Sequence, residues 1–216
     1  MGWLWNMLKF TYQGANTLRL DAATNASRAS YTFATNLNPN YAYLDLANGA
    51  AFRATNLTIG LGGKISGTGA ILANTVTNQG TLAPGHSPGT LVFSSNLTLL
   101  NDSLLVLELQ GTNAADYDHL VVEGTLTKGG TILVTNLGWT FANGNTFDFW
   151  DAAAVSGSFL LTNTWVLPDL GGGLFWDTSL FESEGILSVA AIPEPSVLTA
   201  VVASLGVMLL LRRRKV

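Results

Sequence analysis

A short repeat in the middle of the chain constrains its fold more than any other feature. A triplet of a polar residue, an apolar residue and threonine occurs as Asn56-Leu57-Thr58, Thr75-Val76-Thr77, Asn96-Leu97-Thr98 and Thr125-Leu126-Thr127. The apolar positions are 19, 21 and 29 residues apart. A period of about 20 residues is typical of solenoids, in which each repeat forms one rung of a stack. The repeat therefore predicts stacked rungs that share one interior.

The sequence between the triplets has the alternation expected of β-strands. Leu104, Val106 and Glu108 fall on one face of their segment, while the neighbouring residues Leu105, Leu107 and Leu109 fall on the other. A second β-rich run covers residues 131–135, and glycine-rich turns occur at 60–63, 67–69 and 129–130. We therefore predict β-solenoid repeats over residues 46–137.

The segment from Gly67 to about Gly130 also resembles a known family, the autotransporter-associated β-strand repeat. The resemblance rests on Gly67-Thr68-Gly69-Ala70-Ile71, on the run from Asn78 to Leu91 that contains Pro84-Gly85-His86-Ser87-Pro88-Gly89, and on Asp118-His119-Leu120-Val121-Val122. His86 stands where asparagine is expected in the family's turn. The resemblance implies a right-handed parallel β-helix without catalytic activity of its own.

Residues 138–191 are rich in aromatic side chains, as in Thr146-Phe147-Asp148-Phe149-Trp150 and Leu174-Phe175-Trp176. We interpret this part as closing rungs and a cap, because bulky rings can cover the open end of a stack. The alternative is a carbohydrate-binding groove lined by Trp139, Trp150, Trp165 and Trp176.

The composition changes at Ile192. Pro193-Glu194-Pro195-Ser196 is followed by an uncharged apolar run, residues 197–211, and then by a basic cluster. Ser196 is a plausible helix N-cap, and basic residues flank the cytoplasmic ends of membrane helices. We therefore predict one C-terminal transmembrane α-helix with the body outside, although a stretch of about 15 residues is shorter than the ~20 that span a bilayer. The predicted helix contains Val197, Leu198, Val201, Val202, Leu205, Val207, Met208, Leu209, Leu210 and Leu211, and the basic stop is Arg212, Arg213, Arg214 and Lys215.

This three-part tail, residues 192–216, closely resembles the PEP-CTERM sorting signal of Gram-negative bacteria. The resemblance implies export across the inner membrane, recognition by an exosortase, and delivery to the cell surface or an extracellular polysaccharide matrix. By position, Pro193, Glu194 and Pro195 match the recognition motif. They would be substrate residues for another enzyme.

Composition excludes several classes of function. Four of the ten Lys and Arg residues lie at 212–215, which leaves six basic against fourteen acidic groups upstream, or a charge of −8. Such a body is unsuited to nucleic acid, which needs a basic face. The chain has no cysteine, so disulfides and thiolate metal sites are excluded.

Few residues could carry chemistry. Asp116-Tyr117-Asp118-His119 is the one compact titratable group; it could bind Ca²⁺ or orient a base, but it lacks a third spaced acid, a second histidine and a serine nucleophile. We interpret it as a turn that opens a strand. His86 is expected to be an exposed turn residue, and Asp148 and Asp151 are expected to point to opposite faces of a strand. We therefore predict no catalytic, cofactor-binding or metal-binding residues.

The N-terminus does not resemble a signal peptide. Residues 1–10 are apolar but contain no basic region, no long hydrophobic region and no small-residue cleavage site. Because an exported protein needs such a signal, we expect either a different translation start or a longer surface protein. Residues 1–45 would then form earlier, degenerate rungs.

Together these features predict an all-β fold class, a right-handed parallel β-helix followed by a single transmembrane helix. They favour a non-enzymatic structural or adhesin-like protein of the cell surface or extracellular matrix, held in the inner membrane during sorting. The expected partners are an exosortase-type enzyme, the inner membrane and extracellular polysaccharide, with no cofactor. The alternative is a carbohydrate-binding or carbohydrate-active surface protein that uses the aromatic residues.

Overall fold

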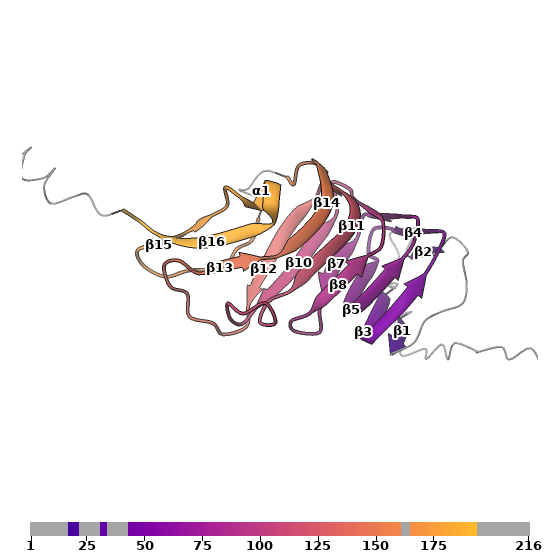
Figure 1. The fold of residues 1–216 in the computed structure, drawn as a ribbon, viewed down its shortest axis with the longest axis horizontal. Coiled ribbons are helices and arrows are strands. Elements are labelled where there is room, and N and C mark those ends of the chain that lie inside the picture. The colour runs from indigo at the N-terminus through magenta and orange to yellow at the C-terminus, as the bar shows by residue number, and fades with distance from the viewer. Residues whose placement is uncertain (1–16, 22–30, 34–42, 161–164, 194–216) are drawn as a thin grey trace, which may run out of the picture.

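The computed structural model describes residues 17–21, 31–33, 43–160 and 165–193, and this part of the chain is mostly β-strand (Figure 1). It contains a 13-stranded sheet, whose paired strands run parallel, and a three-stranded antiparallel sheet. The strands are β1 Thr17–Asp21, β2 Tyr31–Phe33, β3 Tyr43–Arg53, β4 Asn56–Ile59, β5 Lys64–Leu72, β6 Thr75–Asn78, β7 Thr81–Pro84, β8 Thr90–Phe93, β9 Asn96–Leu99, β10 Leu104–Leu109, β11 His119–Lys128, β12 Thr131–Asn136, β13 Thr146–Asp148, β14 Trp150–Gly157, β15 Leu174–Asp177 and β16 Ile186–Ala191, and the helix α1 spans Phe181–Glu184.

The parallel strands form three columns. The first column contains β1, the starts of β3 and β5, and then β7, β10 and β12. The second contains the ends of β3 and β5, β8, and the starts of β11 and β14. The third contains β2, β4, β6, β9 and the ends of β11 and β14. Each pass of the chain through the three columns makes one rung, and the rungs stack from β1 toward β14 (Figure 1).

The triplets of the sequence repeat all lie in the third column. Leu57 pairs with Val76, Val76 with Leu97, and Leu97 with Leu126. All four side chains are buried. The spacing of the repeat is therefore the length of one complete rung, and the larger interval before Leu126 reflects the loop between β10 and β11.

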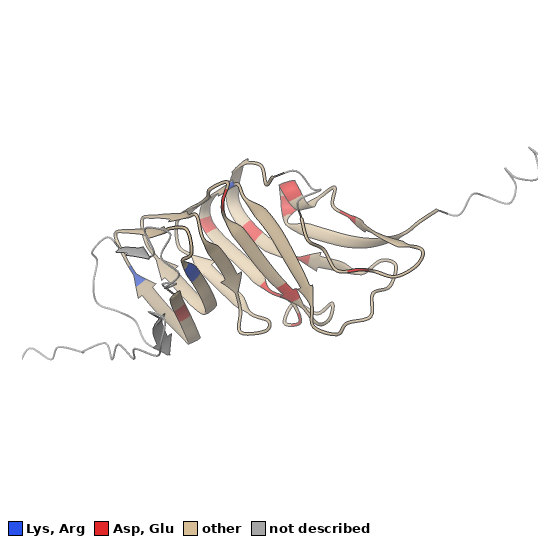
Figure 2. Ribbon diagram, turned by 180° about the vertical axis from the view of Figure 1, so that it is seen from behind, with Lys and Arg blue, Asp and Glu red and all other residues tan. Residues whose placement is uncertain are grey.

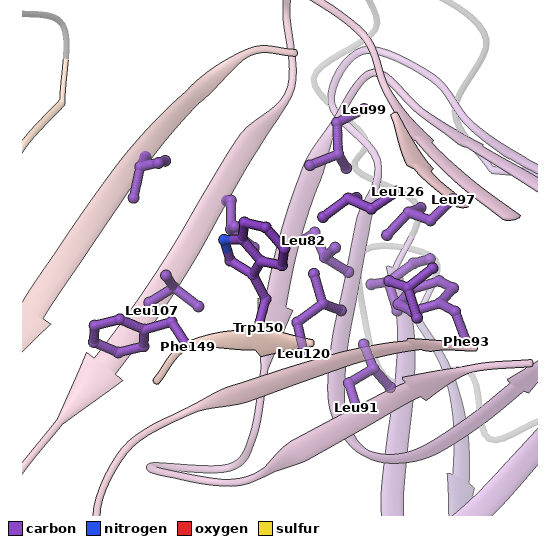
Figure 3. Packing of buried hydrophobic residues seen from close by; sticks show 14 of the residues in the cluster. Leu82, Leu91, Phe93, Leu97, Leu99, Leu107, Leu120, Leu126, Phe149 and Trp150 are labelled. Carbon is purple, nitrogen blue, oxygen red and sulfur yellow. The ribbon is translucent and has the colours of Figure 1, made fainter. Parts of the chain in front are cut away.

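Inward side chains from the three columns form one continuous apolar core. Strand β10 shows the pattern, because Leu105, Leu107 and Leu109 are buried while their neighbours are half-buried on the outside. In the first column Ile65, Leu82 and Leu105 occupy successive rungs in register. Figure 3 shows side chains from different columns meeting in this interior. Burial of such side chains stabilises the fold by roughly 1.5–3 kcal/mol each, which no single rung can obtain alone.

An aromatic cap closes one end of the stack. Strands β13, β16 and β15 form the separate antiparallel sheet, and α1 packs near β14 (Figure 1). Their rings meet edge to face, with Phe181 at 5.2 Å from Trp165 and 6.3 Å from Trp150 between ring centroids. Within residues 138–191, β14 continues the second and third columns, and Val166 forms a parallel bridge to Leu133 of the first column. The closing rungs and cap expected over residues 138–191 stay a prediction.

The predicted fold class, a parallel β-helix followed by a transmembrane helix, is wrong because it includes that helix. Among the described residues the helical segment is the four-residue α1, and no helix of that part of the chain is long and apolar enough to cross a membrane. The prediction of a transmembrane helix and of a three-part sorting signal therefore finds no support. Its weakness is physical, since the apolar run is shorter than the ~20 residues that a bilayer requires. The residues assigned to that helix and to the basic stop lie outside the described residues.

Candidate functional site

The polar side chains of the body gather where the first column turns into the second. The turn between β7 and β8 covers residues 85–89 and lies against the turns of neighbouring rungs. Gly85 has φ +87°, and a Cβ there would lie 2.2 Å from the Asp118 Oδ1 atom. Only glycine allows the turn to approach Asp118 so closely. We call this region, with Asp45 from two rungs earlier and Glu108 and His119 from the next rung, the polar corner.

Asp118 is the buried centre of the polar corner, at 1% exposure. Its Oδ1 accepts a hydrogen bond from the Gly89 N–H at 2.8 Å, and its Oδ2 accepts one from the Glu108 N–H at 2.9 Å. Burial raises the pKa of Asp118 to about 7, against the lowering effect of these two donors. The carboxyl group therefore joins two successive rungs by satisfying backbone N–H groups that would otherwise be buried without partners.

His86 pairs with an acid from an earlier rung. Its Nε2 lies 2.8 Å from the Asp45 Oδ1 atom, and the Ser66 hydroxyl donates to the same oxygen at 3.3 Å. Asp45 thus stands between the serine and the histidine. Nucleophilic catalysis requires the serine to contact the histidine directly, so this arrangement does not activate Ser66. The imidazole is 40% exposed, in agreement with the expectation of an exposed turn residue.

The next turn residue, Ser87, bonds in the opposite direction along the stack, to the rung that follows. Its hydroxyl donates to the Glu108 Oε2 atom at 2.8 Å. A serine bound to a glutamate in this way has no histidine to remove its proton. The contact links the turn to β10. Like the contact of Asp118 with Gly89, it joins two successive rungs.

His119 connects the polar corner to the cap. Its Nδ1 lies 2.8 Å from the backbone oxygen of Asp148, and its Nε2 lies 3.1 Å from the Asp151 Oδ2 atom. Both partners are acceptors, so both bonds form together only when the ring carries two protons. The cap is thereby tied to β11 on its outer side.

Asp148 and Asp151 do not share a strand, which corrects the prediction that placed them on opposite faces of one. Phe149 belongs to neither strand, so Asp148 is the last residue of β13 and Asp151 lies in β14. Burial raises the pKa of Asp148, and the nearby charge of Asp151 adds to the effect. The Asp148 Oδ1 atom is buried without a hydrogen-bond partner in the structure.

The structure separates the members of the run Asp116-Tyr117-Asp118-His119. Asp116 closes its own loop through Asn113, whose Nδ2 donates to it at 2.6 Å, and Tyr117 is buried against Phe147 and Phe149. Asp118 does not orient His119, because its two oxygens face Gly89 and Glu108. Among the described residues no group of three His, Asp or Glu side chains is placed to hold a metal ion. The run is therefore a turn that opens β11, as the sequence indicated.

The four tryptophans proposed as a sugar groove differ in burial. Trp150 and Trp165 are buried at 2% and 8% exposure. The Trp176 Nε1 donates to the Pro168 oxygen at 2.9 Å, and Trp139 packs against the core. Trp150 and Trp165 therefore offer no open ring face, whereas Trp139 and Trp176 are half-buried.

Sequence reasoning missed the partners of these groups. Asp45, Glu108 and the cap pair Lys128 and Glu182 showed no local motif, because their contacts join residues 41, 21 and 54 positions apart. The rung period could have indicated the contacts of Glu108 and Asp45, which span about one and two rungs, but not the cap pair. A residue at a turn meets the equivalent turn about 20 residues away.

Pro193, the first residue of the Pro193-Glu194-Pro195 motif, is the last of the described residues. The Ile192 N–H donates to the Gly173 oxygen at 2.9 Å, and the Ile192 side chain is 55% exposed. Pro193 follows directly and belongs to no strand. Glu194 and Pro195 lie outside the described residues.

A comparison of this chain with protein-family models, curated proteins and solved structures found no match.

Proposed function

We propose that this chain is an exported structural or adhesin-like protein of the cell surface or extracellular matrix, without catalytic activity of its own, and that an exosortase-type enzyme processes it. The observation that carries the proposal is the use of its polar groups. Asp118, Glu108 and His119 each bind a neighbouring rung or the cap. These polar groups therefore stabilise the stack of rungs.

The shape of the body suits a spacer. Parallel rungs add length without changing the cross-section, and each rung contacts mainly its neighbours. The described part is acidic and sparsely charged (Figure 2). An acidic rod of this kind remains soluble among matrix polymers because like charges repel.

The position of the Pro-Glu-Pro motif supports processing by another enzyme. The motif starts directly after Ile192, whose N–H is bonded to Gly173 and whose side chain is exposed. The edges of folded domains are favoured sites of proteolytic cleavage. The proposal uses this motif alone and needs no helix after it.

The test is the mass of the C-terminus after expression of the full chain in a host that contains an exosortase. The matched control is Glu194→Ala, which leaves the described body unchanged. Loss of the residues after the motif in the parent, but not in the variant, is the expected result. An intact C-terminus in both chains would overturn the proposed processing.

A further inference from the structure

The interface between the body and the cap contains a histidine that faces two acceptors. We define this body–cap interface as the contact of β11 with β13, Phe149 and the start of β14. Strands β11 and β14 pair here from Leu120 and Trp150 (Figure 1), and the Leu120 N–H donates to the Phe149 oxygen at 2.9 Å. His119, the first residue of β11, therefore lies beside the point where the chain leaves the cap sheet and enters the last rung.

The imidazole ring of His119 contacts the interface with both of its nitrogen atoms. The Nδ1 atom lies 2.8 Å from the Asp148 backbone oxygen, and the Nε2 atom lies 3.1 Å from the Asp151 Oδ2 atom. Neither partner donates, because a backbone oxygen and an ionised carboxylate only accept hydrogen bonds. In each neutral tautomer one ring nitrogen carries a lone pair, and this lone pair faces an oxygen atom. Both hydrogen bonds therefore exist together only in the doubly protonated ring.

Burial makes a lost contact costly at this position. The His119 side chain is 19% exposed, whereas the Asp151 side chain is 69% exposed. Water can therefore hydrate the carboxylate readily but reaches the ring only in part. A buried group that loses a hydrogen bond without gaining water destabilises the arrangement that buries it. Loss of one ring proton thus favours movement of β13 or β14 away from β11.

Two acids flank the imidazole ring, so its second proton also sets the local charge. Burial raises the pKa of Asp148, the charge of Asp151 adds to this effect, and the charge of His119 opposes it. The Asp148 Oδ1 atom is buried and has no hydrogen-bond partner in the structure. When the ring is neutral, the two carboxylates repel each other without a positive charge beside them. The interface is therefore less stable with a neutral ring.

The other elements packed against His119 bring no charge that could replace its own. Strand β8 places Thr90 opposite it and contains no titratable side chain. Within β11, the Asp118 oxygens face backbone N–H groups, and Glu123 is exposed four residues farther along. Lys128 lies at the opposite end of β11, in the ion pair with the cap helix. The positive charge at this contact therefore depends on His119.

The turn 85–89 also packs against this residue, since the His119 N–H donates to the Gly89 oxygen at 3.0 Å. It contributes the second histidine of the chain, His86. The His86 Nε2 atom lies 2.8 Å from the Asp45 Oδ1 atom, and one protonated nitrogen is enough for this bond. A neutral tautomer of His86 can therefore keep its contact, which makes His86 a matched control for His119.

We propose that His119 is a pH-dependent switch that holds the cap against the body when its ring is doubly protonated and releases it locally when the ring is neutral. Histidine is the side chain that ordinarily changes charge between about pH 5 and 8. Folding favours the bound proton, so the contact contributes fully in mildly acidic solution and is lost as pH rises through neutral. The opening is local, because the Lys128–Glu182 pair and the buried rings of the cap do not depend on this proton. This inference is independent of the proposed function.

The experiment measures hydrogen exchange of the Leu120 N–H in the purified full chain at about pH 5.5 and about pH 8. The exchange rate of an unfolded peptide is the reference at each pH. The test variant is His119→Gln, whose amide does not titrate, and the matched control is His86→Gln. Asp118 is present in all three chains, so its own pH dependence cancels in the comparison. Nitrogen NMR of the parent reports directly whether each histidine ring carries one proton or two.

We expect the protection of the Leu120 N–H to fall between the two pH values by roughly tenfold more in the parent and in His86→Gln than in His119→Gln, which is the effect of one hydrogen bond to a charged group. We also expect the His119 ring to carry two protons at the lower pH and one at the higher. An equal fall in the parent and in His119→Gln would overturn the proposal, as would an equally reduced fall in His86→Gln. A His119 ring that keeps the same number of protons at both pH values would overturn it from the parent alone, without any variant.

Discussion

The ammonium group of Lys128 lies 2.6 Å from the Glu182 carboxylate, and this contact joins the interior of the last rungs to the helix of the cap. The Lys128 side chain is 5% exposed and also donates to the backbone oxygen of Glu182. Its charge lies 5.9 Å from the centre of the Trp150 ring. The second Glu182 oxygen accepts the Phe159 N–H at 3.1 Å, so one acid fixes both the lysine and the loop that leads into the cap.

The two partners of this ion pair should respond unequally to mutation. Glu182→Ala leaves a buried lysine without a carboxylate to balance its charge, and we expect it to lower the free energy of unfolding by about 3 kcal/mol. Lys128→Met leaves Glu182, which is 38% exposed and can be hydrated, so we expect a loss of about 1 kcal/mol or less. Urea unfolding measures both. Equal losses would mean that the pair acts through packing alone.

Gly85 and Gly144 provide a matched test of the polar corner. Both have φ +87°, but a Cβ at Gly144 meets nothing within 4 Å, whereas one at Gly85 meets Asp118. We expect Gly144→Ala to cost about 1 kcal/mol from backbone strain. Gly85→Ala should cost roughly 3 kcal/mol or more, since Asp118 must move and release two backbone donors. Thermal unfolding gives the comparison, and similar costs would contradict the close packing of this turn.

Asp118 should make stability depend on pH. Its pKa is raised from 3.8 to about 7 in the folded state by burial, so folding favours the protonated acid. Its contribution is therefore complete below a pH of about 4 and is lost as pH rises toward 7, by up to about 4 kcal/mol.

The variant Asp118→Asn isolates this effect from that of Asp148, whose pKa is also raised. We expect the stability advantage of the parent over Asp118→Asn to be largest near the acid end of this window and to shrink toward neutral pH. Urea unfolding at a series of pH values measures the difference. A difference that grows as pH rises would show that the two backbone donors hold Asp118 in its ionised form.

The core of the third column should be sensitive to loss of a single side chain. Leu97 is fully buried between Val76 and Leu126, so Leu97→Ala should cost about 2–5 kcal/mol. Leu100, at 38% exposure in the adjoining turn, is the control, and its change to alanine should cost about 0.5 kcal/mol or less. Comparable effects at the two positions would contradict the inward assignment.

The parallel strands were predictable from sequence because each rung repeats the same inward position. Leu57 and Val76 have to be apolar for the same reason, and their spacing records the length of a rung. The aromatic cap was predictable in its place but not in its topology. Antiparallel pairing of β13 with β16 joins segments about 40 residues apart, such as Thr146 with Ser188, and has no period.

The contacts of the polar corner could not be predicted in the same way. His86 and Asp118 were visible as polar residues, but their partners depend on which turns stack. The end of β13 before Phe149 was not predictable either, because aromatic residues favour β-strands on both sides of it. The membrane helix was predicted from an apolar run, the prolines and Ser196 before it, and the basic cluster after it, and these helix residues lie outside the described residues.

The most direct test of the proposed function asks whether the body lies outside the cell. Intact cells that produce the full chain with an exosortase are treated with an amine reagent that cannot cross membranes, and labelling is measured at Lys64, on the outer side of β5, and at the buried Lys128. We predict labelling of Lys64 on intact cells or in the surrounding matrix, with Lys128 labelled only after denaturation. Labelling of Lys64 only after the cells are broken would contradict a surface or matrix protein.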